Sequence, residues 1–211
     1  MCGRYAIKKS TLLVTNSLVK KNINVDLEQE NFNCSPGGKY PIIKSATNGK
    51  YLELTTWGIK PSWAKEDFRS LHNARLEGIE TKVSFKKLII NSRAVVPCSG
   101  YYEWKKSEDK KIPNYFSRVD DQDIFFAGIH DNGKFAIITR EAVLENSEIH
   151  HRQPVIISKT NINNYFNLNN NAVEFLNSVK PPKLKFHEIS TDVNNPAKND
   201  PSIINPLKQN K

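Results

Sequence analysis

The sequence predicts a single α+β domain, and three observations lead to that prediction. Short apolar runs separated by turn residues dominate the middle of the 211-residue chain, a pattern typical of β-strands joined by hairpins. Helical spacing of apolar residues is confined to a few short segments. No repeat of about 20 to 50 residues and no Gly/Ser-rich linker divides the chain. One domain is therefore expected over residues 1–206, followed by a tail at 207–211.

The strand predictions depend on alternation and on turn residues. In YPIIKSATNGKY the pair Asn48-Gly49 favours the positive φ values of a tight hairpin turn between two apolar stretches. Residues 52–56 alternate between apolar and polar side chains, as a half-buried strand does. Further strands are expected at 93–97, 101–104, 114–119, 124–129 and 134–139.

Helices are expected at fewer places. Ser10 is a suitable cap for a helix over TLLVTNSLVKKN, and helical spacing also occurs in EGIETKVSFKKLII and at 172–179. The Asn-rich run at 162–171 is either a loop or a helix capped at Thr160. The segment after Asp192 is rich in Asn and Pro, so we expect it to lie over the surface without regular structure.

Composition and charge exclude several classes of protein. With 38% hydrophobic and 25% charged residues the chain is neither wholly disordered nor collagen-like. No apolar run approaches the roughly 18 residues of a membrane helix, and MCGRYAIKKS lacks the apolar region of a secretory signal. The formal net charge of +9 makes a polyanion the first partner to consider. The alternative is a basic surface that only keeps the protein in solution.

The cysteines carry the most specific chemical signal. Cys2, Cys34 and Cys98 are odd in number and widely spaced, which favours a reducing compartment over a disulfide framework and provides no zinc motif. Removal of Met1 would leave Cys2 with a free amine, whose pKa is ordinarily near 8, beside a thiol whose pKa is ordinarily near 8.5. Such an aminothiol forms an imine with an aldehyde and then closes a thiazolidine ring through sulfur. The alternative is an incidental small residue in a disordered terminus.

Several motifs in a fixed order weigh against that alternative. LHNARLE occupies residues 71–77, GYYEW residues 100–104 and IHHRQPVII residues 149–157. Together with MCGRY, NCSPG, WGIKPSW, FAGIHD and FAIITREA, they resemble the SRAP family, whose members shield abasic sites in single-stranded DNA by cross-linking to them. The resemblance extends from Cys2 to about Pro206. It implies the SRAP fold, an α+β domain with curved, partly barrel-like antiparallel sheets and flanking helices.

The resemblance also implies four catalytic residues. Cys2 is the cross-linking nucleophile, Glu103 a proton shuttle in imine formation, and His150 a proton donor to the sugar oxygen during ring opening. Asn73 orients the sugar or the terminal amine. For Glu103 the alternative is a solvated strand glutamate, and for Asn73 a structural turn residue. His151 is expected to be a bystander.

DNA binding is implied for a second set of residues. Arginines suit phosphates and aromatic rings stack on bases, although a tryptophan is more often a core residue, and Trp57 is open to that interpretation. The candidates are Arg4, Asn33, Pro36, Trp63, Arg75, Trp104, Thr139 and Arg152. No cofactor, metal or membrane partner is implied. The partner is single-stranded DNA with abasic sites, bound by a monomer in the cytoplasm at the nucleoid, or in a eukaryotic nucleus.

Three functions follow as hypotheses. The first is an abasic-site cross-linking protein, which the family resemblance extends to a lyase route. The second is a thiol peptidase with Cys2 as nucleophile and His150 as base, acting on its own leading residue. The third is a non-covalent single-strand binding module. Gln153, Arg140 and Glu141 depart from the family pattern, which affects sequence preference and affinity more than the reaction.

Overall fold

A computed structural model describes residues 2–207, and its centre is a sheet that closes on itself. Strands β11, β10, β7, β4 and β5 are hydrogen-bonded in that order, and a parallel pairing of β5 with β11 closes the ring. This sheet contains β2 (Lys21–Ile23), β4 (Lys39–Ala46), β5 (Gly49–Trp57), β6 (Asn73–Arg75), β7 (Arg93–Cys98), β10 (Ile124–Asp131), β11 (Lys134–Glu141), β12 (Arg152–Pro154) and β13 (Ile156–Ile157). The predicted α+β fold with a partly barrel-like sheet is confirmed.

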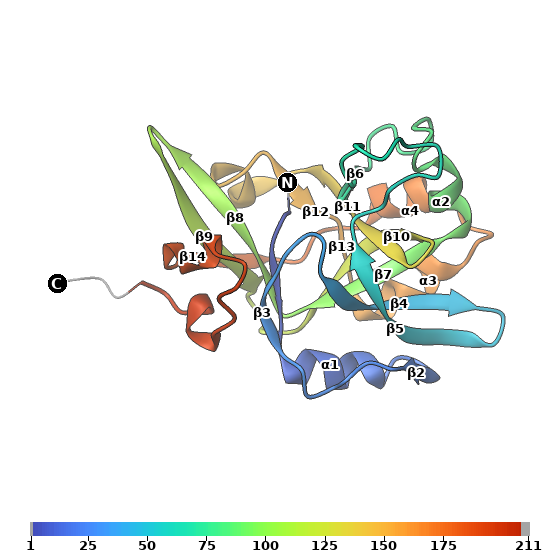
Figure 1. The fold of residues 1–211 in the computed structure, drawn as a ribbon, viewed down its shortest axis with the longest axis horizontal. Helices are drawn as coiled ribbons and strands as arrows, with labels where there is room; N and C mark the ends of the chain where they lie inside the picture. The colour runs from blue at the N-terminus through green and yellow to red at the C-terminus, as the bar shows by residue number, and fades with distance from the viewer. Residues whose placement is uncertain (1, 208–211) are drawn as a thin grey trace.

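A second sheet packs beside the barrel and carries the chain's beginning. Its strand order is β14-β9-β8-β1-β3. Strand β1, which begins at Tyr5, therefore lies between β8 and β3. The strands are β1 (Tyr5–Ile7), β3 (Asn31–Cys34), β8 (Gly100–Ser107), β9 (Lys110–Arg118) and β14 (Leu184–Glu188). The hairpin of β8 and β9 extends away from the body (Figure 1). In Figure 1 the residues that lead into β1 lie between this hairpin and the segment that contains β6.

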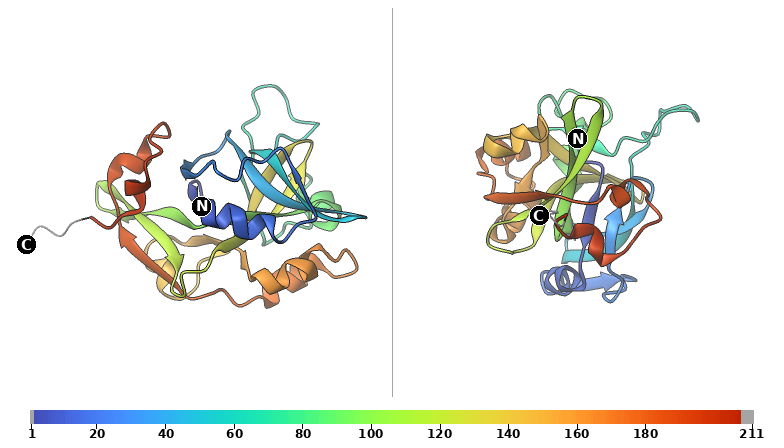
Figure 2. Two further views of the ribbon diagram at one scale, coloured as in Figure 1. Left: turned by 90° about the horizontal axis from the view of Figure 1, so that it is seen from below. Right: turned by 90° about the vertical axis from the view of Figure 1, so that its left-hand side faces the viewer.

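The barrel strands are apolar on both faces because two cores lie against them. On β7, Val95 belongs to one core, whereas Ala94 and Val96 belong to the other. The first core is covered by α3 and α4, and the second lies under the five-stranded sheet, with Trp57 fully buried (Figure 2). A strand buried on both faces shows apolar runs instead of strict alternation, which explains the runs at 93–97, 124–129 and 134–139 that form β7, β10 and β11.

The predicted helices are confirmed in part. They are α1 (Lys9–Asn16), α2 (Lys86–Asn91), α3 (Ile162–Phe166) and α4 (Ala172–Ser178), with 3₁₀ turns η1 (Leu144–Glu148), η2 (Lys159–Asn161), η3 (Thr191–Asn194) and η4 (Pro201–Ile204). Ser10 is not a cap, because α1 begins at Lys9, and the end of the expected helix forms β2 instead. Asn171, whose side chain accepts from Val173 and Glu174, caps α4.

The predicted turn at Asn48-Gly49 and the turn between β10 and β11 differ in backbone conformation. Ala46 pairs with Gly49 at the end of the β4–β5 hairpin, but only Gly49 has a positive φ there. Between β10 and β11, Asn132 and Gly133 both have positive φ, as a primed hairpin turn requires.

The segment after Asp192 is pinned to the body and does not lie loosely over it. Asn33 donates its side-chain amide to the carbonyls of Val193, Asn195 and Lys198, at 3.3, 2.9 and 2.8 Å. Asn199 accepts from the Phe32 backbone, at 2.6 Å. The prediction of a segment without regular structure is corrected by η3 and η4, which bury Val193 and Ile203. The predicted tail at 207–211 lies, apart from Leu207, outside the described residues.

Candidate active site

Cys2 lies inside the protein, with no exposed side-chain surface. The Asn73 amide donates to its carbonyl oxygen at 2.8 Å, and its Sγ lies 3.9 Å from the carbonyl of Arg4. Chain ends are ordinarily poorly ordered, whereas these two contacts hold Cys2 in place. Its environment changes the chemistry expected from sequence. Burial raises the pKa of the thiol well above its ordinary value, and the charge of Glu103 raises it further, so the resting thiol is protonated.

Asn73 holds the nucleophile because of its position at the barrel rim. Strand β6 runs parallel to β11, with Asn73 opposite Ile137. Its Nδ2 is used by Cys2, whereas its buried Oδ1 has no hydrogen-bond partner among residues 2–207. A buried acceptor of this kind is ordinarily satisfied, and a ligand that brought a hydroxyl or amine to this position would satisfy it.

Glu103 is a buried carboxylate on β8, only 3% exposed. Burial raises its pKa from 4.5 to about 7. The solvated-strand interpretation of this residue is therefore wrong. A carboxyl group with a pKa near 7 exists in both protonation states at neutral pH, which is the condition for efficient proton transfer in either direction.

His150 follows η1 and, together with Glu103, lines a cavity of about 700 Å³. The cavity is also lined by Trp104, Ile149, His151 and Asn194. The Nδ1 atom of His150 lies 3.0 Å from the backbone nitrogen and 3.1 Å from the backbone oxygen of Arg152. Burial lowers the pKa of His150 to about 4, so the ring is neutral at pH 7. His151 stacks on it with ring centroids 4.4 Å apart.

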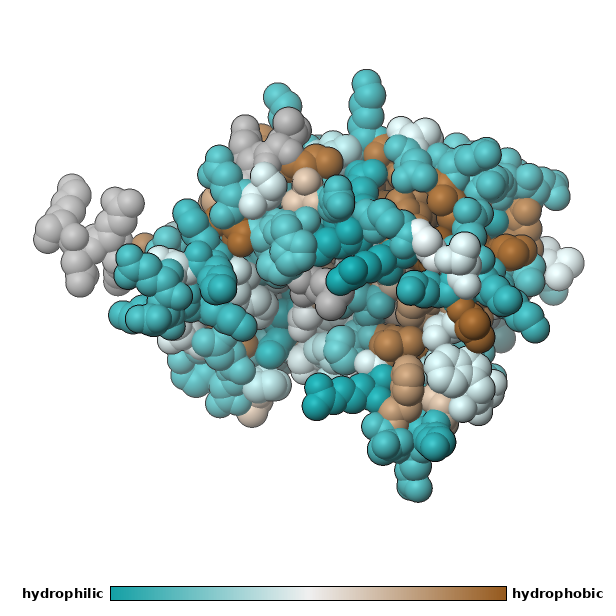
Figure 3. Space-filling view, turned by 90° about the horizontal axis from the view of Figure 1, so that it is seen from above, coloured by the Kyte–Doolittle hydropathy of each residue, from teal (hydrophilic) through white to brown (hydrophobic). Residues whose placement is uncertain are grey.

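The eight residues predicted to bind DNA fall into three groups by exposure. Trp63, 56% exposed and edge-to-face with Phe68, and Arg75 are open to solvent, whereas Arg4, Pro36 and Trp104 are half-buried. Trp57, in contrast, is a core residue that donates to the His72 carbonyl. The face that is seen from above in Figure 3 is mostly hydrophilic.

Asn33, Thr139 and Arg152 are enclosed. Asn33 is 3% exposed, accepts from Arg4 at 2.8 Å and holds the carboxyl-terminal segment. Arg152, 6% exposed, donates to Glu77 with two nitrogens, at 3.0 and 2.8 Å, and to the Thr139 carbonyl at 2.7 Å. Glu77 was not selected from the sequence, although it ends the LHNARLE motif. Its ion pair joins the segment that follows Asn73 to the strand that follows His150.

No group of three His, Cys, Asp or Glu side chains within residues 2–207 is placed to hold a metal ion. In the same part of the chain, no helix combines the length and the apolar character needed to cross a membrane.

Comparisons with known proteins agree with this arrangement. The sequence model of the SRAP family, described as SOS response associated peptidase, matches residues 1–196. The chain is 29% identical to the abasic site processing protein YoqW of Bacillus subtilis, over 97% of this chain and 99% of that protein. It is 33% identical to the abasic site processing protein YedK of Escherichia coli, over 75% and 76% of the two chains.

Solved structures show the same fold. A protein from Bacteroides thetaiotaomicron superposes with a TM-score of 0.73 at 24% identity, covering 95% of this chain and 92% of that one. A phage-related protein from Bordetella bronchiseptica gives a TM-score of 0.73 at 25% identity, with 89% and 94% covered. The chain belongs to the SRAP family.

Proposed function

We propose that this protein processes abasic sites in single-stranded DNA by forming a covalent thiazolidine cross-link through Cys2, after removal of Met1. The observation that carries the proposal is the fixed position of Cys2, which Asn73 holds by its carbonyl beside Glu103. The names of YoqW and YedK support the substrate class. The acting unit is residues 1–206 as a monomer, located with DNA in the cytoplasm or nucleus.

The first chemical step opens the abasic deoxyribose to its aldehyde. In this step a proton moves from the C1′ hydroxyl to the ring oxygen, so one group must accept a proton and another must donate one. The neutral ring of His150 is held at Nδ1 by the backbone of Arg152, so it exchanges protons with a ligand through Nε2. A phosphate bound nearby favours the imidazolium and raises the pKa of His150 from about 4 toward neutrality.

The second step forms two bonds to the same carbon. The Cys2 amine attacks C1′, and the carbinolamine loses water to give an imine. Glu103, with a pKa of about 7, accepts the proton of the amine and returns one to the departing hydroxyl. The thiol then adds across the C=N bond, with sulfur going to carbon and its proton to nitrogen. The balance is one thiazolidine and one water, and no thiolate has to exist in the resting protein.

The imine is also the branch point for strand cleavage. A base that removes the C2′ proton before sulfur closes the ring eliminates the 3′ phosphate, which is the lyase route. We propose this as a minor path, because Cys2 holds amine and thiol on one residue and ring closure requires no diffusion.

The thiol peptidase hypothesis receives less support. A Cys–His peptidase depends on a thiolate beside a protonated imidazole. Here burial raises the pKa of Cys2 and lowers the pKa of His150, so both groups are neutral. Removal of Met1 from the chain itself is compatible with the site, because it needs no pocket for a separate peptide.

The test is intact mass spectrometry of the purified protein, alone and after incubation with a single-stranded oligonucleotide that carries one abasic site. We expect free protein without the mass of Met1, and a heat-stable adduct that is absent in Cys2→Ala. Cys2→Ser keeps the amine and should give only an adduct that needs borohydride to trap it. Retention of Met1, or DNA binding without any adduct, would reduce the protein to a non-covalent binding module.

A further inference from the structure

The cavity beside Glu103 and His150 continues onto the β8–β9 hairpin, where two lysines line it. Lys106 and Lys111 are exposed and lie directly opposite each other in the antiparallel register. They share one face of the hairpin with Trp104 and Pro113, which form the next opposed pair on that face. Glu103, three residues before Lys106, projects from the other face of β8. The cavity connects the two faces, because Glu103 and His150 line it together with Trp104 and the two lysines.

This placement costs stability in the free protein. Like charges directly opposite on neighbouring strands repel each other. Within residues 2–207, no side-chain hydrogen bond or ion pair engages the ammonium group of Lys106 or Lys111. Lys9, Lys44, Lys185 and Lys198, in contrast, have carboxylate partners. Glu148 is the one exposed carboxylate on the cavity wall. A ligand with negative charge would relieve the repulsion between the two lysines.

We propose that Lys106 and Lys111 form a phosphate-binding subsite for the DNA strand on one side of the abasic nucleotide. The proposal rests on the proposed function and extends it to the strand flanking the lesion. From Glu103 to Lys106 the strand rises about 10 Å, at roughly 3.3 Å per residue. That distance brings the two ammonium groups to the first phosphates beyond the lesion, with the half-buried Trp104 ring between them and the reacting carbon.

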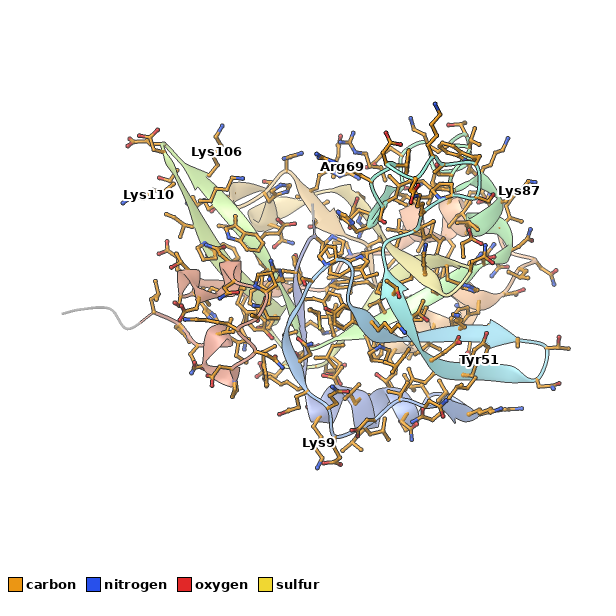
Figure 4. All side chains as sticks on the ribbon, viewed as in Figure 1. Lys9, Tyr51, Arg69, Lys87, Lys106 and Lys110 are labelled. Atoms are coloured by element: carbon orange, nitrogen blue, oxygen red, sulfur yellow. The ribbon has the colours of Figure 1, made fainter. Side chains whose placement is uncertain are left out.

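The hairpin provides its own matched control. Lys105 and Lys110 lie on the opposite face, outside the cavity. In Figure 4 the side chains of Lys106 and Lys110 leave the hairpin on different sides. The variants Lys106→Ala/Lys111→Ala and Lys105→Ala/Lys110→Ala each remove two positive charges from the same hairpin. Both variants therefore lose the same net charge and the same number of lysines from an exposed strand edge. A difference between them reports a local phosphate contact.

The experiment measures the affinity of both variants for a single-stranded oligonucleotide with one abasic site, as a function of salt. Two phosphate contacts contribute a slope of about 1.4 to the log–log dependence for single strands. Between about 50 and 200 mM salt, the advantage of the wild type over Lys106→Ala/Lys111→Ala should therefore shrink about sevenfold. For Lys105→Ala/Lys110→Ala the ratio should stay nearly constant. Oligonucleotides with the flank on only the 5′ or only the 3′ side should restrict the loss to one of them.

Equal slopes for the two variants, or equal losses with both flanks, would overturn the subsite. Cross-link yield at saturating protein is read in parallel and separates this proposal from the one it rests on. If the wild type forms the adduct and the slopes are equal, only the subsite fails. If no adduct forms but the slopes differ as stated, the phosphate contact stands and the covalent chemistry fails.

Discussion

Replacement of Glu103 by glutamine should make the protein more stable at alkaline pH while abolishing cross-linking. Burial raises the pKa of Glu103 from 4.5 to about 7, so the native state binds this proton more tightly than the unfolded chain does. Between these two values stability falls as pH rises, because ionisation in the interior is unfavourable. Glutamine has the size of the neutral acid and carries no charge at any pH.

The magnitude follows from proton linkage. With the carboxyl titrating at 4.5 in the unfolded chain and about 7 in the native state, the wild type should lose about 2.5 kcal/mol between about pH 5 and pH 8, relative to Glu103→Gln. Urea unfolding followed by tryptophan fluorescence gives this difference from the transition midpoints. The slope of free energy against urea should be the same for both proteins.

Glu66→Gln is the control, because Glu66 is an exposed carboxylate in the loop before β6. Its stability should follow the wild type across the pH range. Parallel curves for wild type and Glu103→Gln would refute the reasoning, since they would mean that Glu103 ionises in the folded protein as readily as in the unfolded chain. Diverging curves would show that the protein keeps a buried carboxylate at its site although the ionised form lowers the free energy of unfolding.

Three further predictions follow from the contacts around the site. Asn33→Ala removes the donor to Val193, Asn195 and Lys198. It should lower the free energy of unfolding by about 2 kcal/mol and speed hydrogen exchange in residues 193–199, and unchanged exchange would contradict this role. Glu77→Ala leaves the enclosed Arg152 without its carboxylate. Because Glu77 is half-exposed, we expect a loss of about 1–2 kcal/mol, smaller for Glu77→Gln, and equal stability of Glu77→Ala and wild type in urea would oppose it. The third concerns His150, whose ring proton resonances should titrate near pH 4 in free protein and at higher pH with DNA bound. As pH falls from 6.5 toward 4, the wild type should lose stability relative to His150→Gln, since the unfolded chain binds the proton more readily. A midpoint near 6.5 in the free protein would contradict this prediction.

The sequence predicts the barrel well because its strands are local patterns. Each run from residue 93 to residue 139 forms one strand, β7, β10 and β11 in the barrel and β8 and β9 in the neighbouring sheet. The failures occur where tertiary contacts override local preference. Residues 21 and 22 were expected to end a helix, but they pair with β5 instead. The Asn-rich segment after Asp192 looks unstructured because its anchor, Asn33, lies about 160 residues earlier.

For the candidate site, too, local sequence is informative and tertiary environment is not visible in it. The residue types at Cys2, Asn73, Glu103 and His150 are visible as motifs. Their protonation states are not, because burial determines them and it is set by the whole fold. The sequence also cannot distinguish an arginine that meets solvent from one that is paired internally. Arg75 and Arg152 look equivalent as phosphate ligands, but only Arg75 is exposed.

Strand β1 is synthesised long before β8, with which it pairs, and this delay affects how the chain's beginning is processed. Cys2 is enclosed by Asn73 and by β8, so its buried environment forms only after about 100 further residues have left the ribosome. At roughly 5 to 20 residues per second, the chain's beginning stays accessible for about 5 to 20 seconds. If a cellular aminopeptidase removes Met1, it acts within this interval, before Cys2 is buried. For the same reason, a purification tag fused ahead of Cys2 would occupy the amine permanently, and any tag belongs at the other end of the chain.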